Sequence, residues 1–366
     1  MSRGSERMPF SSWVYDCNYV PVKMSLLCEL GRAYQISEQE ILEGTGVQPE
    51  KLASQFMRTS LAQFVRAYEN FVTRVDDVTV PARMAAQLHL HTYGTYGYTL
   101  MSGPTIRDVV DNALRYHRLA GPIYHTRWQE VGEEFIWQLT DPVMPLQNLQ
   151  AAHHILAMQI CFHAVHMRDA LGDQTYAPLR ARMPAALRPF QTALETTLSC
   201  PIAFDAPSPA LFHARTMLDR PTVFSHLLTN IEMRAQCDRQ LAEHMATTGI
   251  SHRIYNRVRA NPAMAPTMTL LASEMNISVR SLRRLLSEEG STYEIIVDTV
   301  RNSLARDLVA GTTMTIEAIS QRTGYNEAAN FRRAFRRWTG VSPKEFRALN
   351  GSLRFDSPES TRSETD

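Results

Sequence analysis

The stretch IEAISQRTGYNEAANFRRAFRRWTGVSPKEFR, residues Ile316–Arg347, decides the fold of the C-terminal part of this chain. Ile316 and Ile319 lie one helical turn apart, and Gly324 ends that helix. A second helix begins at position 326 or 327 and is anchored by aromatic residues at helical spacing: Phe331, Phe335 and Trp338. The pattern predicts a helix-turn-helix unit. With the aromatic residues inward, arginines remain on the outer face: Arg332, Arg333, Arg336 and Arg337.

An upstream stretch, TMTLLASEMNISVRSLRRLLSEEG over residues 267–290, repeats this layout. Asn276 stands at the turn and Ser278 is the expected N-cap of the following helix. The expected inward residues are leucines and one methionine: Leu270, Leu271, Met275, Leu282, Leu285 and Leu286. The outward set is again basic: Arg280, Arg283 and Arg284.

Outward arginines on a helix suit the major groove of B-DNA, where Arg contacts guanine edges or phosphates. The segment between the units has an apolar side of Val297, Val300, Leu304 and Leu308. It predicts a stiff helix that sets the two outer helices about one DNA turn apart, so that one protomer covers roughly twenty base pairs. The alternative is that arginine-rich amphipathic helices are solvated faces. Two such units in tandem favour DNA binding.

The charge is distributed unevenly along the chain, although the net charge is only +1. Residues 251–350 carry 15 basic and 9 acidic side chains, whereas residues 1–250 carry 21 and 24. The basic segment shows no strand pattern and predicts helices over 251–260, 267–275, 278–289, 293–310, 315–323, 327–338 and 343–349. A mildly acidic body with a basic module is typical of a sensor joined to a DNA-binding head.

Length and composition exclude several classes of protein. A length of 366 residues and an apolar content of 44% predict two domains, each with a hydrophobic core. The apolar runs are too short for a membrane helix, and the start MSRGSERMPF lacks the apolar segment of a secretory signal. We therefore expect a cytoplasmic protein that does not contact a membrane. Five scattered cysteines without CxxC spacing predict reduced thiols.

The front two-thirds of the chain mix helix and strand patterns. A hairpin is expected around Val131-Gly132, strand-like pieces near 201–207 and 210–214, and a long helix over 149–171. The glycine- and aromatic-rich stretch 89–103 predicts loop or strand backbone. A helix over 223–245 leads out of this part and carries a broken apolar stripe, which indicates a homodimer seam: Val223, Leu227, Ile231, Leu241 and Met245.

The basic module resembles the DNA-binding domain of the AraC/XylS family of bacterial transcription regulators. The resemblance rests on the run GY…FRRAFRRWTGVSPKEFR and on LASEMNISVRSLRRLLSEEG upstream. It implies promoter DNA and RNA polymerase as partners. It also implies base-facing positions at Arg280, Arg283 and Arg284 in the first unit, and at Asn326, Ala328, Ala329 and Arg333 in the second.

Some positions depart from the family pattern. Ser320 stands where a small Ala is usual, and Thr323 replaces a frequent Leu. Ala328 and Ala329 lack hydrogen-bonding side chains, so we expect the second unit to read few bases and to contact thymine methyl groups or phosphates.

Residues 20–215 resemble the N-terminal domain of the family's ornithine and virulence-regulator branch. This resemblance rests on two stretches of sequence, YGTYGYTLMSGPTIRDVVDNALRYHRL and LETTLSCPIAFDAPSPALFHARTMLDRP. The resemblance implies effector binding or oligomerisation in an α+β domain that differs from the β-barrel of the sugar-binding relatives. A candidate pocket combines aromatic walls with polar tips, although core packing explains the same residues equally well: His89, His91, Tyr93, Tyr96 and Tyr98.

Neither a metal site nor an enzyme is expected. His89 and His91 have no carboxylate or Cys at ligand spacing beside them, and His163 and His166 lie in a largely apolar helix, where core histidines are common. The sequence has no GxSxG, HExxH, P-loop or GxGxxG motif, although a Cys–His pair distant in sequence leaves no such trace. No cofactor is predicted.

Together these patterns predict an N-terminal α+β effector or oligomerisation domain followed by an all-α domain with two helix-turn-helix subdomains. The expected divisions are a flexible N-terminus over 1–19, a regulatory domain over 20–215, a helical linker over 216–249, a DNA-binding domain over 250–349 and a disordered tail over 350–366. The expected function is sequence-specific regulation of transcription under control of a small-molecule effector. The alternative is a constitutive regulator whose N-terminal domain only oligomerises or binds a protein.

Overall fold

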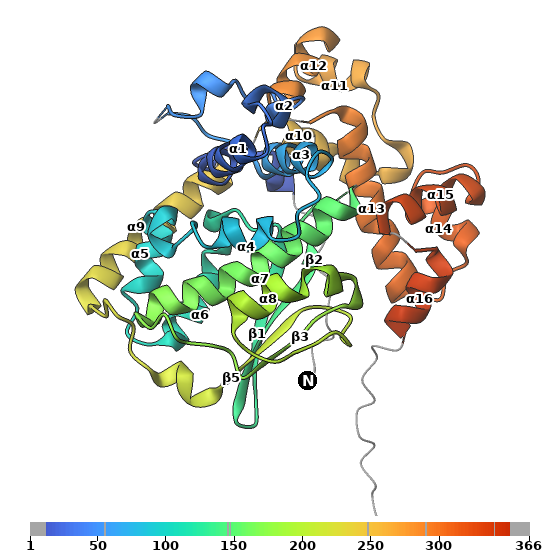
Figure 1. The fold of residues 1–366 in the computed structure, drawn as a ribbon. Helices are drawn as coiled ribbons and strands as arrows, with labels where there is room; N and C mark the ends of the chain where they lie inside the picture. Colours follow the sequence, from blue (N-terminus) through green and yellow to red (C-terminus); the bar gives the residue numbers. More distant parts are fainter. Residues whose placement is uncertain are drawn as a thin grey trace, which may run out of the picture.

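The computed structural model describes residues 12–351, apart from positions 55, 145, 147, 247, 248, 290 and 340. Within this part of the chain, an α+β region is followed by an all-α region (Figure 1). This order confirms the fold class that the sequence predicts. Both the first 11 residues and the expected tail beyond position 351 lie outside the described residues.

The α+β region is built from short helices around one sheet. Its α-helices are α1 (Val22–Ala33), α2 (Glu38–Leu42), α3 (Leu61–Val72), α4 (Val80–Ala85), α5 (Thr95–Met101), α6 (Ile106–Arg115), α7 (Leu149–Leu171) and α8 (Gln191–Leu198). Short 3-10 helices lie at η1 (Ser12–Tyr15), η2 (Pro49–Lys51), η3 (Leu90–Tyr93), η4 (His117–Ala120), η5 (Ala185–Phe190) and η6 (Arg215–Asp219). The strands are β1 (Tyr124–Val131), β2 (Glu134–Pro142), β3 (Arg180–Arg182), β4 (Ile202–Ala203) and β5 (Ala210–Ala214).

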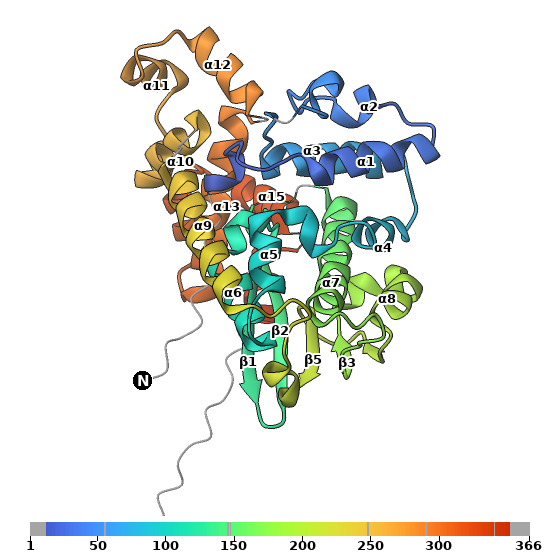
Figure 2. The same cartoon turned by 90° about the vertical axis from the view of Figure 1, so that its left-hand side faces the viewer.

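The C-terminal region is helical wherever the structure describes an element. Helix α9 (Leu227–Ala246) leads to α10 (Ile250–Ala260), η7 (Pro262–Met264), α11 (Met268–Glu274), α12 (Val279–Glu288), α13 (Tyr293–Gly311), α14 (Ile316–Arg322), α15 (Ala328–Thr339) and α16 (Pro343–Gly351). Figure 2 shows α9 running past α5 toward α10. Among the described helices, no segment is long and apolar enough to cross a bilayer.

The sheet is open and has the strand order β1-β2-β5-β3-β4. Adjacent strands of the sheet pair antiparallel, except for β3 and β4, which pair parallel. The β1–β2 hairpin turns at Gly132, whose φ of +59° favours glycine. Both this hairpin and α7 lie where the sequence predicts them. Helix α7 packs on the sheet: the ring of Trp137 on β2 stacks on His163 of α7, with 4.7 Å between centroids.

The prediction of loop or strand backbone over 89–103 is wrong, because this stretch forms η3 and α5. Gly97 explains the error. A Cβ at this position would lie 1.7 Å from the carbonyl oxygen of Leu90, so only glycine lets α5 pack so closely on η3. The alternating aromatic residues reflect two faces of a short helix rather than the period of a strand.

Residues 12–19, which we expected to be flexible, are in part deeply buried. Val14 and Tyr15 of η1 have no exposed surface. The hydroxyl of Tyr15 shares a hydrogen bond of 3.0 Å with Thr299 Oγ1 on α13, which belongs to the helical region. The N-terminal segment therefore links the two regions.

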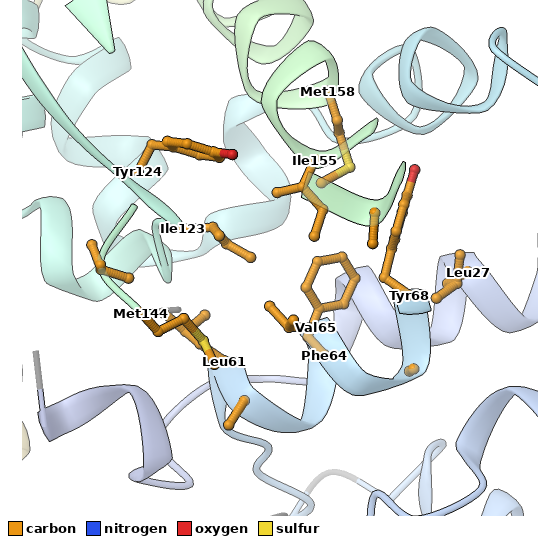
Figure 3. Packing of buried hydrophobic residues seen from close by; sticks show 14 of the residues in the cluster. Leu27, Leu61, Phe64, Val65, Tyr68, Ile123, Tyr124, Met144, Ile155 and Met158 are labelled. Carbon is orange, nitrogen blue, oxygen red and sulfur yellow. The ribbon is translucent and has the colours of Figure 1, made fainter. Parts of the chain in front are cut away.

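One hydrophobic core runs from the α+β region into the first helices of the C-terminal region. It includes the residues around α3 and α7 shown in Figure 3, such as Phe64, Tyr68 and Ile155. The same cluster continues to Tyr255 on α10 and Leu286 on α12. A separate cluster holds α13–α16 together: Ala305, Val309, Ile319, Phe331, Ala334, Phe335, Trp338 and Phe346.

Two histidines are buried uncharged between α7 and β5. The Nε2 atoms of His163 and His213 are 3.1 Å apart, and the side chains of Tyr176 and His213 are hydrogen-bonded. Burial lowers the pKa of His213 to about 3, and burial together with His213 lowers the pKa of His163 well below its usual value. Each histidine must gain a proton when the chain unfolds in acid.

Acid is therefore expected to destabilise the fold through His213. Below the ordinary histidine pKa of about 6.5, the unfolded chain binds the proton and the folded chain does not, so stability falls as the pH drops. At pH 5 this difference costs about 2 kcal/mol. Urea unfolding at pH 7 and pH 5 measures the loss. We expect His213→Gln to lose about 2 kcal/mol less than the wild type over this interval, whereas an equal loss would contradict the prediction.

Candidate nucleic-acid interface and regulatory cavity

The first helix-turn-helix unit consists of α11 and α12. Asn276 forms the turn with a φ of +55°, and Ser278 Oγ accepts a hydrogen bond of 3.0 Å from Ser281 N–H, which caps α12 as predicted. Leu282 and Leu286 are fully buried. Leu270, expected inside, is instead exposed, because Leu271 fills the core position of α11.

The second unit consists of α14 and α15. Gly324 makes the turn with a φ of +80°, and Phe331 and Phe335 are completely buried. The two departures from the family pattern are accommodated by hydrogen bonds. Ser320 Oγ donates to the carbonyl oxygen of Tyr325 over 3.1 Å, and Thr323 Oγ1 donates to that of Ile319 over 2.8 Å.

The outer faces of α12 and α15 carry the predicted side chains at the surface. The exposed residues are Arg280, Arg283, Arg284, Asn326, Ala329, Arg332, Arg333, Arg336 and Arg337, while Ala328 is half-buried. The structure thus brings each predicted set together on one helix or its leading turn. It leaves their contacts to DNA as predictions.

Several of these arginines already hold partners within the chain. Arg284 pairs with Glu288, Arg332 with Glu317 over 2.8 Å, and Arg337 with Asp298 over 2.6 Å. Arg333 donates to the side-chain oxygen of Asn330. Among the described residues, we find no such partner for Arg280 or Arg283. A contact from either of these two guanidinium groups to DNA would therefore not require the exchange of an internal acceptor.

The end of α12 contacts the start of α3 in the α+β region. Gln63 Nε2 donates to the carbonyl oxygen of Glu288 over 3.0 Å, and Ser60 Oγ donates to that of Glu289 over 3.4 Å. The carboxylate of Glu289 accepts the backbone N–H groups of Ile250 and Ser251, each over 2.8 Å. Sequence reasoning missed the contacts between α3 and the end of α12, because their residues lie more than two hundred positions apart.

Two neighbouring cavities lie in the α+β region. The inner cavity, of about 90 Å³, is lined mainly by apolar side chains of α5, α6, β2 and α7, among them Leu100, Val110, Leu139 and Phe162. Its polar lining includes Gln159 and three histidines: His117, His163 and His166. The outer cavity, of about 430 Å³, is bounded by α1, the start of α3, η3 and α9. Lys23, Tyr93, Tyr96 and Ala120 line both cavities. The outer one falls in the size range of small-molecule sites.

The predicted effector residues divide between different places. Tyr93 and Tyr96 line both cavities, as a pocket role requires. His89, His91 and Tyr98 line neither of them. The ring of His89 hydrogen-bonds Asp169 over 2.9 Å and stacks on His91, and Tyr98 is 53% exposed on the far side of α5. No group of three potential metal ligands lies among the described residues.

Two helix-turn-helix units attached to an α+β domain with cavities define a DNA-binding regulatory protein. Residues 36–222 match the family model described as the arabinose-binding domain of AraC transcription regulator, N-term, and residues 271–349 match a helix-turn-helix domain. The chain belongs to the AraC family of DNA-binding transcription regulators.

The relatives agree with this assignment. VqsM, an HTH-type transcriptional regulator of Pseudomonas aeruginosa, is 37% identical over 281 residues, which cover 71% of this chain and 80% of VqsM. The ornithine utilization regulator of the same organism is 26% identical over 340 residues, covering 91% of this chain and 97% of that protein. The crystal structure of the P. aeruginosa regulator CdpR is 19% identical, covers 94% of this chain and 100% of that one, and gives a TM-score of 0.43.

Proposed function

We propose that this chain regulates transcription by binding specific promoter DNA through α12 and α15, and that a small molecule bound in the α+β region controls this binding. The observation that carries the proposal is that Ser60, Leu61 and Phe64 line the outer cavity, while Ser60 and Gln63 contact the end of α12. The same turn of chain therefore faces both a ligand-sized cavity and a DNA-contacting helix. RNA polymerase as a further partner is supported by family membership alone.

Control would act through a shift between two arrangements of the first unit. A ligand that contacts the start of α3 stabilises whichever arrangement fits it better, and its effect equals its difference in affinity for the two. Helix α9 supplies a second connection, because Gln240, Glu243 and His244 line the outer cavity just before the chain enters α10. The second unit has its own core and is coupled less directly.

Native mass spectrometry of the purified full-length chain tests the effector role. We expect a small mass that stays on the folded chain and is lost on unfolding, or one that appears when candidate ligands are added. L-arabinose belongs in that set, because it is named in the description of the matched family model. The chain could instead keep its unliganded mass with every candidate and form a dimer. That result would favour the constitutive regulator whose N-terminal domain only oligomerises.

A homodimer is the second part of this proposal, and an apolar surface at the start of α9 and in the turn before it supports it. Val223, Phe224, Leu227, Leu228 and Ile231 are all exposed. The other two residues of the predicted stripe differ: Leu241 packs inward, and the side chain of Met245 lies outside the described residues. Exposed apolar patches of this kind mark protein interfaces. The seam therefore covers the first half of α9 rather than its full length.

Leu228→Glu is expected to convert the dimer into a monomer, because the side chain is 71% exposed and a buried unpaired carboxylate would weaken the seam strongly. Native mass spectrometry at a fixed protein concentration gives the ratio of dimer to monomer. Leu149→Glu is the matched control, since this leucine is also exposed but lies at the start of α7. Equal ratios for Leu228→Glu and the wild type would place the seam elsewhere.

A further inference from the structure

Lys23 on α1 carries an ammonium group inside the α+β region. The chain has three lysines, and the other two, Lys51 and Lys344, are exposed. Lys23 Nζ donates to the carbonyl oxygens of Ala120 over 3.1 Å and Gly121 over 2.8 Å. Among the described residues, no carboxylate forms an ion pair with it.

An enclosed ammonium without an anion is costly. Burial lowers the pKa of Lys23 to about 8, so the group is still largely protonated at neutral pH. The rings of Tyr93 and Phe162 lie 5.6 Å and 5.9 Å from Nζ, which offsets only part of the cost. An ammonium has three N–H donors, and the two carbonyl oxygens use two of them. One donor and one positive charge remain available.

The surroundings of Lys23 indicate which kind of anion would pair with its ammonium group. The inner cavity beside it is mostly apolar, although Gln159 and three histidines (His117, His163 and His166) also line it. At about 90 Å³ it is smaller than the cavity of about 150 Å³ that holds a benzene ring. It suits a narrow aliphatic group. The outer cavity on the other side is larger and mixed in polarity, with Arg58 and Glu243 among its residues. One unpaired ammonium matches a single negative charge rather than a phosphate dianion.

We propose that Lys23 Nζ, placed between the inner and outer cavities, binds the carboxylate of an aliphatic monocarboxylic acid that is the effector of this protein. The apolar chain enters the inner cavity between Val110 and Phe162, and any further part of the molecule lies in the outer cavity. This assignment rests on the proposed effector control. It places the ligand next to Ser60 and Leu61, at the junction with α12.

Calorimetric titration of the full-length chain with butanoate, hexanoate and octanoate tests the proposal. We expect at least one acid to bind at least tenfold more tightly than the alcohol of equal length. Lys23→Met should lose this preference, and Lys51→Met, which removes an exposed lysine, should keep it. Comparison of acid with alcohol in the wild type keeps the test valid if Lys23→Met does not fold. Equal binding of acid and alcohol, or no binding of any acid, overturns the assignment.

A DNA-binding measurement separates this proposal from the function on which it rests. If the acids fail but native mass spectrometry finds a different retained molecule that changes DNA affinity, only the carboxylate assignment is wrong. If no retained or added molecule changes DNA affinity, effector control fails as well. If an acid binds with the expected preference and changes the affinity for DNA severalfold, both are supported.

Discussion

Phe331→Ala is expected to lower the free energy of unfolding of the second helix-turn-helix unit by about 3–5 kcal/mol, the usual cost of deleting a buried aromatic ring. Phe331 has no exposed surface, and its ring lies 5.6 Å from that of Phe335 and 6.0 Å from that of Tyr325. A small core has little to replace these contacts. The unit would unfold under conditions in which the wild type is folded, and DNA binding that needs both units would be lost.

The loss should be confined to this unit, because the core formed by the second half of α13 and by α14–α16 is separate from the core that joins α10, α12 and the first half of α13 to the α+β region. Hydrogen exchange resolved by segment measures this: we expect rapid exchange over α14–α16 and protected amides in α3 and α7. Asn330→Ala, on the exposed side of the same helix, is the control and should leave both unchanged. Exchange that increases equally across the whole chain would show that the two cores unfold as one.

Arg283→Ala is expected to weaken binding to the specific site by about 1–3 kcal/mol, roughly 5- to 150-fold. Its guanidinium is exposed on α12 and has no internal partner among the described residues, so the whole interaction with a guanine or phosphate is lost. Arg284→Ala should cost less, since Arg284 must first leave Glu288. Fluorescence anisotropy with operator DNA, selected by enrichment of bound genomic fragments, gives the affinities.

Ala328→Ser is the control for this ranking, because a half-buried small residue at the start of α15 offers little contact to lose. Both arginine variants should weaken specific binding more than Ala328→Ser does, and an equal or reversed order would refute the assignment. Salt dependence identifies the contact. Loss of a phosphate contact reduces the slope of log K against log salt by about 1 and weakens all sequences alike, whereas loss of a base contact relaxes specificity.

The helix-turn-helix units could be predicted from sequence because their determinants are local. Ser278 caps α12 by accepting the N–H of the residue three positions ahead, and Gly324 provides the left-handed φ of the second turn. Phe331 and Phe335 are separated by one helical turn. Each signal acts within a few residues, and the outward arginines follow from the inward apolar ones. The same locality made the β1–β2 hairpin and α7 predictable.

The errors arose where packing overrides the local pattern. Glycines at 94 and 97 suggested extended backbone. Gly94 instead supplies the φ of +55° between η3 and α5, and close approach of α5 to η3 makes glycine necessary at position 97. The broken apolar stripe of the helix over 223–245 was predicted as a dimer seam along its length. Asn230, Cys237 and Leu241 instead face α5 and α6. Among the described residues, the exposed large apolar side chains of this segment lie at the start of α9 and in the turn before it.

The sequence by itself determined the class of this protein, an α+β domain followed by two DNA-binding units. The reason is that helix periods, caps and turn glycines depend on residues that are close in sequence. Only the tertiary structure decided which residues line the cavities and which contact α12. The Gln63–Glu288 contact spans 225 positions, and the carbonyl oxygens that hold Lys23 lie 97 and 98 positions away. Such contacts depend on how whole helices pack, and no local pattern of residue types encodes them.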